Sequence, residues 1–409
     1  MLLTHELTQP IVDKTMAIIK KNINIMDHRA VIIASGDRDR LGSFHEGAAR
    51  VIANGHSMEI STTDMNVLRG VRPGVNLPIV FGGKIAGVVG ISGDPEEVRS
   101  SGELVRVAVE LMLEQLVLKE QLNLETRARE SFMQELLAGE SGPNEALFLA
   151  RASILSYDLQ IPRYAIVIDV DRFGRVVEEK LSSRDDMRTG ELALQQLKEG
   201  IFHTIERAFS ISGKELIAFA GGDKFVVLKD SKNWRINKQQ KQEVQMVIKK
   251  VMDDIYQDTG LTVTVGVGKL YGDYRQYAQS YKEALAAIDT GQRLWGRGKA
   301  YWAEDMPVEN LLAILPGKVL RDYMQEVLGP LLKEGEARHL DETLNTLEAL
   351  FEHGLNVTRA ARALFVHRNT VIFRLEKLEE LTGYRPSLSF QDALKLKLAI
   401  VAWRYLQAE

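Results

Sequence analysis

The start of the chain changes from a helical to a β-type hydrophobic pattern. Residues 4–21 carry apolar side chains at near-helical spacing, which predicts a helix. The β-branched runs at 23–26 and 31–33 predict two strands, because the segment 27–29 between them has the composition of a tight turn. Together these elements predict the beginning of a small mixed α/β module.

A second helix and a hairpin complete this module. Ser43 and Glu46 have the spacing of a capping box, which predicts a short helix beginning there. Apolar runs at 77–81 and 85–91 flank a Gly-Gly turn, so they predict a β-hairpin with one or both faces buried. We therefore expect a domain of helices and antiparallel strands with a loop placed to form a pocket.

Strong helix formers occupy residues 95–139. Apolar residues recur there at intervals of three to six positions from Val105 to Leu122, which predicts one long amphipathic helix. It is longer than one small domain needs, so part of its apolar face is expected to pack on a partner chain or to bridge two domains. The alternative is a core helix of the next domain. The breaker cluster at 139–143 predicts the helix end and a domain boundary.

The middle of the chain combines strand and helix patterns. β-branched runs predict strands at 164–171, 216–219, 225–228 and 261–267. Helical stretches lie between them, which favours an α/β sheet layered with helices. From about residue 306 the pattern is helical to the end. The predicted fold class is therefore multidomain, α/β followed by all-α. The predicted domains are 1–138, 139–305 and 306–409.

Residues 356–386 have the pattern of two helices that meet at a tight turn. Asn356 is placed to cap the first helix. Small Ala360 and Ala361 allow a second helix to pack close against the first at a steep crossing. The second helix is predicted to start near His367. This patterning is typical of a helix-turn-helix.

The second predicted helix has two different faces. Val371 and Leu375 form its inward face, and the opposite face is polar and basic. Arginine suits guanine and asparagine suits adenine, so Arg368 and Asn369 in the first turn are predicted to contact base edges. Other side chains are predicted to hold the DNA backbone. The remaining predicted DNA-binding residues are Thr358, Arg359, His367, Thr370, Phe373, Arg374 and Lys377.

Positive charge is concentrated in this segment. Residues 356–377 contain five basic residues and one acidic residue, a local balance of +4, although the whole chain has a net charge of -4. Binding to duplex DNA would account for this local positive charge. Each phosphate that a basic side chain neutralises releases a counterion, which favours binding. The alternative is an ordinary helical hairpin with a solvated basic face.

The overall composition limits the remaining possibilities. The chain has 409 residues, of which 26% are charged and 45% hydrophobic, so we expect several globular domains. The absence of cysteine excludes disulfides and thiolate metal sites. Residues 1–21 lack a signal-peptide pattern, and no apolar run approaches the ~20 residues of a membrane span. A soluble cytoplasmic protein without cofactor or metal is expected.

The C-terminal residues carry a resemblance to a known family. The sequence HRNT at 367–370, followed by 373–375 and 381–383, resembles the C-terminal helix-turn-helix of the purine-catabolism-regulator type. Phe373 stands where that family usually has Tyr. This departure removes at most one phosphate hydrogen bond.

The N-terminal part carries a second resemblance. Residues 11–52 and 71–98 are similar to the sugar diacid recognition domain of the carbohydrate diacid regulator family, and the order of all three parts matches that family too. The resemblance implies a transcriptional activator of genes for using glucarate, galactarate or glycerate-type acids. Its expected partners are double-stranded DNA, a small sugar acid and a second copy of the chain in a homodimer.

A sugar acid carries carboxylates and hydroxyls. Its binding site therefore needs guanidinium groups to pair with the carboxylates and polar groups to hydrogen-bond the hydroxyls. Arg38, Arg40 and Arg72 offer the charge. Each candidate has a structural alternative: a helix cap for Glu46, solvated ion pairs for the arginines beside aspartates, and simple burial for His45. The predicted ligand-binding residues are Ser35, Arg38, His45, Glu46, Arg72 and Asn76.

Residues 220–225 resemble the GGDEF hairpin of diguanylate cyclases, with Asp169 and Asp171 where those enzymes place a metal-binding carboxylate. Lys224 replaces the glutamate, which removes two units of negative charge where Mg²⁺ would be held. The Asn-Asp pair for guanine is missing from 172–178. We therefore expect a degenerate domain for dimer contacts or signal relay. The alternatives are a nucleotide cyclase, or a metabolite sensor that acts through a protein partner.

Overall fold

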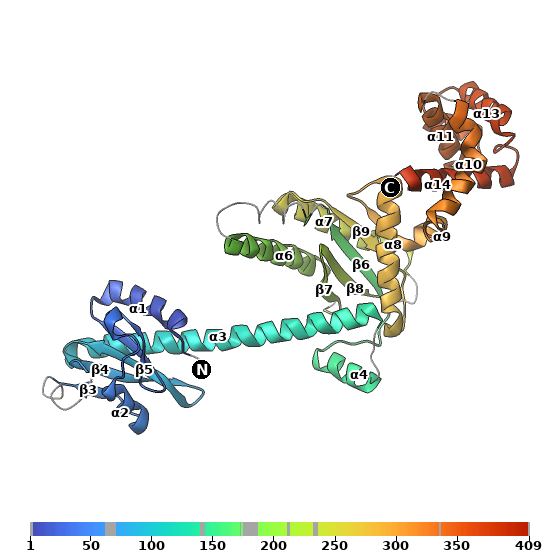
Figure 1. The fold of residues 1–409 in the computed structure, drawn as a ribbon. Coiled ribbons are helices and arrows are strands. Elements are labelled where there is room, and N and C mark those ends of the chain that lie inside the picture. The colour runs from blue at the N-terminus through green and yellow to red at the C-terminus, as the bar shows by residue number, and fades with distance from the viewer. Residues whose placement is uncertain are drawn as a thin grey trace. The chain divides into compact units, whose positions relative to one another are not determined.

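The computed structural model describes residues 3–61, 71–139, 144–171, 173–174, 187–210, 213–231, 236–334 and 337–407. The chain divides into two compact units, Met1–Ala128 and Arg129–Glu409. Figure 1 shows their elements, which we describe one unit at a time. One continuous helix, α3 (Pro95–Ala138), begins in the N-terminal unit and ends in the second unit. The predicted long helix is therefore confirmed.

The N-terminal unit is a five-stranded antiparallel sheet with the strand order β2-β1-β5-β4-β3. Helix α1 (His5–Ile19) and the first half of α3 cover one face, where Val12, Val105 and Val109 are buried. Helix α2 (Glu46–Asn54) covers the other face, after a 3-10 turn η1 (Arg38–Arg40). The strands are β1 (Ile23–Asp27), β2 (Ile32–Ser35), β3 (Met58–Ile60), β4 (Gly74–Phe81) and β5 (Lys84–Ser92).

The predicted first helix, strands and hairpin of this unit are confirmed, but the predicted capping box is wrong. His45 is the N-cap of α2, and its Nδ1 accepts a hydrogen bond from the Ala48 amide at 3.1 Å. Ser43 cannot start the helix because its carbonyl accepts the Ile32 amide, and Phe44 bridges to Val31. The segment before His45 is thus held in an extended conformation by the sheet edge.

The central part of the second unit is a five-stranded sheet with the order β10-β9-β6-β8-β7. β10 runs parallel to β9, and the other neighbours are antiparallel. The four predicted strands are confirmed, and β10 is an addition to them. The strands are β6 (Arg163–Val170), β7 (Leu216–Gly221), β8 (Lys224–Asp230), β9 (Val263–Val267) and β10 (Ala300–Trp302).

Helices cover both faces of this sheet. Helices α6 (Met187–Phe209) and α7 (Lys238–Thr259) bury apolar side chains against one face. Helix α8 (Tyr277–Trp295), preceded by η3 (Tyr274–Gln276), lies on the other face with α4 (Glu145–Ile154). The arrangement confirms the predicted α/β layering.

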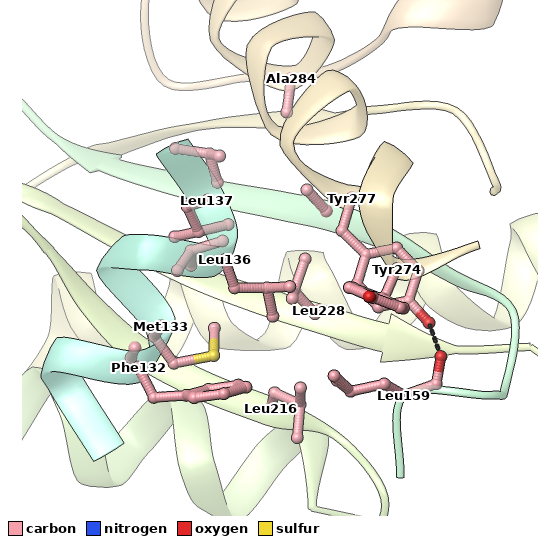
Figure 2. Close-up of a cluster of buried hydrophobic side chains, with 14 of the residues drawn as sticks. Phe132, Met133, Leu136, Leu137, Leu159, Leu216, Leu228, Tyr274, Tyr277 and Ala284 are labelled. Atoms are coloured by element: carbon pink, nitrogen blue, oxygen red, sulfur yellow. Dashed lines mark hydrogen bonds between the residues drawn. The ribbon is translucent and has the colours of Figure 1, made fainter. Parts of the chain in front are cut away.

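The last turns of α3 belong to the core beneath α8. Figure 2 shows Phe132, Met133 and Leu136 directed toward the β-strand residues Leu216 and Leu228. Phe132 is fully buried and stacks on Phe148 of α4 with ring centroids 4.6 Å apart. The helix is therefore an integral part of this core.

The remainder of the chain is helical, as predicted. Helices α10, α11, α12, α13 and α14 share one apolar core. Among the residues that the structure describes, no helix is both long enough and apolar enough to cross a membrane. After η4 (Ala303–Asp305), the helices are α9 (Pro307–Ala313), α10 (Gly317–Glu334), α11 (Ala337–Glu352), α12 (Val357–Ala363), α13 (Arg368–Thr382) and α14 (Phe390–Gln407).

Candidate DNA-binding and ligand-binding sites

Helices α12 and α13 form the predicted helix-turn-helix. The side chain of Asn356 caps α12 by accepting the Arg359 amide at 3.0 Å, as the sequence predicted. Ala360 and Ala361 are buried where α12 meets α13. Helix α13 follows the His367 N-cap, and its predicted inward residues, Val371 and Leu375, are buried; Leu378 is buried beside them.

The outer face of α13 presents the predicted DNA-binding residues to solvent. Arg368 and Asn369 are exposed in the first turn, where the His367 ring caps the helix by accepting the Asn369 amide at 3.3 Å. Phe373 and Lys377 lie on the same helix and are exposed as well, whereas Thr370 is half-buried. Also exposed are Thr358, Arg359 and His367. This surface combines positive charge with side chains long enough to reach base edges.

Arg374 has a different environment from the other predicted contacts. Its guanidinium donates to Glu342 Oε2 at 2.8 Å and to Thr346 Oγ1 at 3.1 Å, both on α11. The side chain is 21% exposed. Arg374 therefore ties α13 to α11, and any phosphate contact it makes would compete with this ion pair.

The turn between the two helices contains a feature that the sequence did not indicate. Phe365 has a φ of 55°, in the left-handed region, and is 97% exposed. That conformation favours glycine, so an aromatic side chain there is held against its backbone preference. The turn therefore exposes an aromatic ring two residues before the N-cap of α13.

A row of buried polar residues crosses the sheet of the N-terminal unit on the α2 face. Ser35 of β2 is paired in register with Asn24 of β1, Asn24 with Gly90 of β5, and Gly90 with Asn76 of β4. The Ser35 hydroxyl donates to Asn24 Oδ1 at 2.7 Å. Ser35, Asn24 and Asn76 are each at most 3% exposed. We call Ser35, Asn24, Gly90 and Asn76 the polar row.

The polar row meets the start of α2. A Cβ on Gly47 would lie 3.2 Å from His45 Cε1 and 3.3 Å from Asn76 Nδ2, so these side chains converge on that glycine. Gly90 is equally constrained, because a Cβ there would lie 2.8 Å from Asn76 Oδ1. The structure thus brings two predicted ligand-binding residues together, His45 and Asn76, and places a third, Ser35, at the other end of the same row. Asn24 completes the row and was missed.

Two arginines place positive charge near this row. Arg72 donates to Asp37 Oδ2 at 2.9 Å and is exposed. The pKa of Arg40 is lowered, first by burial and then by repulsion from Arg72, so the two guanidiniums lie within electrostatic range. The Asp37 carboxylate offsets part of that repulsion, and the carboxylate of a ligand in its place would do the same.

The other two predicted ligand-binding residues have different settings. Arg38 is exposed on η1. Glu46 lies in the first turn of α2, where it accepts from Arg50 at 3.2 Å in an i,i+4 ion pair. A carboxylate at this helix end uses the same electrostatic attraction that an anionic ligand would use.

We expect His45 to make the stability of the N-terminal unit pH-dependent. Burial, then repulsion from Arg40, lowers its pKa from 6.5 to about 4. Between those values the unfolded chain binds a proton that the folded chain rejects, so stability falls as the pH falls. The full effect is about 3 kcal/mol, from ~1.4 kcal/mol per pKa unit.

We expect His45→Asn to remove most of this pH dependence, because asparagine can still cap α2 without titrating. Differential scanning calorimetry of the N-terminal transition between pH 7 and pH 4 measures it. An equal loss of stability in both proteins would show that His45 is not the group responsible.

The central sheet carries the site that resembles a cyclase. Gly221 at the end of β7 and Gly222 in the turn to β8 both have a φ in the left-handed region. Lys224 Nζ lies 2.7 Å from Asp223 Oδ1 and 3.3 Å from Asp169 Oδ1. Asp171 is 3% exposed and faces the Arg297 guanidinium at 3.4 Å.

These carboxylates are already paired with cations of the chain itself. Burial raises the pKa of Asp169, and the attraction of Lys224 offsets only part of that effect. The pKa of Lys224 is raised, because its bonds to Asp223 and Asp169 outweigh its burial. Mg²⁺ needs clustered oxygen ligands, and an ammonium among them repels it. The residues present therefore do not fit a catalytic metal.

Along this chain, a domain with a buried polar row is followed by a central α/β domain and then by a helix-turn-helix that exposes Arg359, Arg368 and Lys377. Together they define a class of protein, the DNA-binding regulators that carry their own sensor domain. Family models match all three parts: sugar diacid recognition at residues 3–136, the GGDEF-like domain at 138–290 and the PucR C-terminal helix-turn-helix domain at 343–402.

Comparison with individual proteins defines the family. The Carbohydrate diacid regulator of Escherichia coli is 33% identical over 403 residues, covering 97% of both chains. The chain therefore belongs to the carbohydrate diacid regulator family. The Purine catabolism regulatory protein of Bacillus subtilis is 32% identical over 34% of this chain and 26% of its own. A solved Regulator of Polyketide Synthase Expression from Bifidobacterium adolescentis is 15% identical over 68% of this chain and 98% of its own, with a TM-score of 0.30.

Proposed function

We propose that this chain is a transcriptional activator whose DNA binding responds to a sugar diacid such as galactarate or glucarate. The observation that carries the proposal is the polar row beside two arginines, in a chain whose helix-turn-helix exposes Arg359, Arg368 and Lys377. Hydroxyls of a sugar acid would hydrogen-bond Asn24 and Asn76, and its carboxylate would take the place of Asp37 on Arg72. Arg38 and Glu46 remain proposed contacts at the edge of the site.

The effector test is a thermal-shift panel of galactarate, glucarate, glycerate and the neutral sugar galactose. A ligand at a hundred times its Kd stabilises the state that binds it by about 2.7 kcal/mol. We expect the acids to raise the melting temperature of the N-terminal unit and galactose to leave it unchanged. The same assay with Arg72→Ala should show affinity reduced by about 10- to 100-fold, since a charge-assisted hydrogen bond contributes ~1.5–3 kcal/mol.

Arg99→Ala is the matched control. Arg99 is also an exposed arginine of this unit in an ion pair with a carboxylate, Glu59. Its replacement removes the same charge and an equivalent ion pair, and the acid-induced shift should remain. A full shift in the Arg72→Ala protein would show that the ligand binds elsewhere.

We propose that the central domain transmits the signal and does not turn over GTP. Lys224 and Arg297 occupy the electrostatic position that a catalytic metal would need. The proposed site of action is the cytoplasm, and the proposed partners are an operator duplex, the sugar acid and a second copy of the chain.

A further inference from the structure

Helix α3 has a second apolar face that the N-terminal unit does not bury. Val98, Val105, Val109 and Leu113 pack into the core of that unit. On another side of the same helix, five large apolar side chains are between 43% and 69% exposed. They are Leu104, Val107, Leu111, Leu118 and Leu122.

The exposed positions follow a heptad repeat. Leu104, Leu111 and Leu118 are seven residues apart, and Ala108, Gln115 and Leu122 interleave with them at alternating steps of four and three. All six are exposed. We call these six residues the seam. A spacing of 3.5 residues is the period of a helix packed along another helix in a left-handed coiled coil, with the leucines at d and Ala108, Gln115 and Leu122 at a.

We propose that the seam is the dimer interface, where α3 of one chain and α3 of a second copy form a parallel, in-register coiled coil. The inference rests on the proposed function, because paired recognition helices require two copies of the chain. The further inference specifies which surface forms the dimer and that the two α3 helices run parallel.

Charge complementarity supports a second copy as the occupant. In this heptad frame Glu114 is a g residue and Lys119 is the following e residue, and both are exposed. A parallel in-register pair places Glu114 of one chain against Lys119 of the partner subunit, twice by symmetry. An antiparallel pair would instead bring g residues together and e residues together.

Gln115 supports the register. It is the only strongly polar residue of the seam, at an a position between Leu111 and Leu118. In register, the two glutamine amides face each other and can hydrogen-bond. In a pair shifted by one heptad, one amide would face Leu122 and the other Ala108, each without a hydrogen-bond partner, which costs more than the bond contributes. A single polar a residue is a known way to fix the register of a two-stranded coiled coil.

The absence of cysteine from the chain makes a direct test possible. We expect the full-length Ala108→Cys protein to form a disulfide-linked dimer under mild oxidation, because facing a residues are close enough for a disulfide only in the parallel in-register pair. Glu120→Cys is the control: residue 120 is exposed at an f position, directed away from the partner. Cross-linking of both at equal rates, or of neither, would overturn the proposal.

A second measurement uses charge to separate the helices. The Leu111→Asp/Leu118→Asp protein should sediment as one 45.9 kDa chain, whereas the unaltered protein should sediment at twice that mass. Both positions are exposed in the single chain, so neither core loses a side chain and the variant should still fold. Its melting temperature should fall only by the contribution of the dimer and should no longer depend on protein concentration. If this variant is still a dimer, the seam is not the dimer interface.

These experiments can distinguish a wrong dimer interface from a wrong proposed function. The monomeric variant should keep the acid-induced thermal shift, since neither Leu111 nor Leu118 lies at the polar row. Cross-linking without any acid shift or DNA binding would reject the function and retain the seam. If the Ala108→Cys protein binds the acid and DNA but does not cross-link, the proposed function is retained and the seam is rejected as the interface.

Discussion

The Arg368→Ala protein is expected to bind its DNA about 10- to 100-fold more weakly than the unaltered chain, at fixed salt. Arg368 is exposed in the first turn of α13, where a guanidinium can donate two hydrogen bonds to guanine. Loss of such a base contact costs ~1–3 kcal/mol and relaxes preference at that base pair. Fluorescence anisotropy measures it, with a duplex enriched from a random pool by the unaltered protein and single-base variants of that duplex.

Two further variants separate base contacts from general electrostatics. Lys377→Ala, a proposed phosphate contact, should weaken binding to all duplexes alike and reduce the slope of log affinity against log salt by about one. Lys318→Ala removes an exposed cation from the start of α10, outside the helix-turn-helix, and should change neither quantity. Unaltered affinity and base preference in the Arg368→Ala protein would instead favour a sensor that acts through a protein partner.

The second large effect is a loss of stability on replacement of Phe132. This residue contributes to the core of the second unit, although its helix, α3, begins in the N-terminal unit. Phe132→Ala should lower the free energy of unfolding of the second unit by ~3–5 kcal/mol. The ring is fully buried, stacks on Phe148 and lies 5.6 Å from the Tyr157 ring centroid, so its removal leaves a cavity between α3 and α4. All four tryptophans lie in the second unit, so their fluorescence during urea unfolding reports on this unit alone.

Ile154→Ala provides the comparison. Ile154 is the last residue of α4 and is 82% exposed, so the same kind of truncation there should change stability by less than ~0.5 kcal/mol. Equal effects of the two substitutions would mean that the end of α3 does not contribute to this core in solution.

Long elements could be predicted from local pattern, and short ones could not. The runs at 164–171 and 225–228 contain enough β-branched residues to specify strands by themselves. β3 and β10 have three residues each, too few to establish an alternation. They are strands because a neighbour pairs with them, as Met58 pairs with Asn76 and Tyr301 with Gly266.

The two candidate sites differ in the same way. The recognition surface lies on a single helix, so the 3.6-residue period was enough to identify its outer face. The polar row is built from strands that are distant in sequence, and Asn24 within an apolar strand gives no local signal of a partner at Gly90. The ion pair of Arg374 with Glu342 spans 32 residues, which is equally invisible to local pattern.

The continuity of α3 restricts how sensor and output parts can be recombined among relatives. The described side chains of residues 118–131 are all exposed, whereas Val109 and Leu113 before them and Phe132 after them are buried in separate cores. A chimera joined at residue 139 would import foreign core residues into the central domain. Chimeras joined within 124–131 would keep both hydrophobic cores and the heptad spacing of the seam intact. This stretch is therefore the best place to join the sensor domain of one relative to the output domains of another.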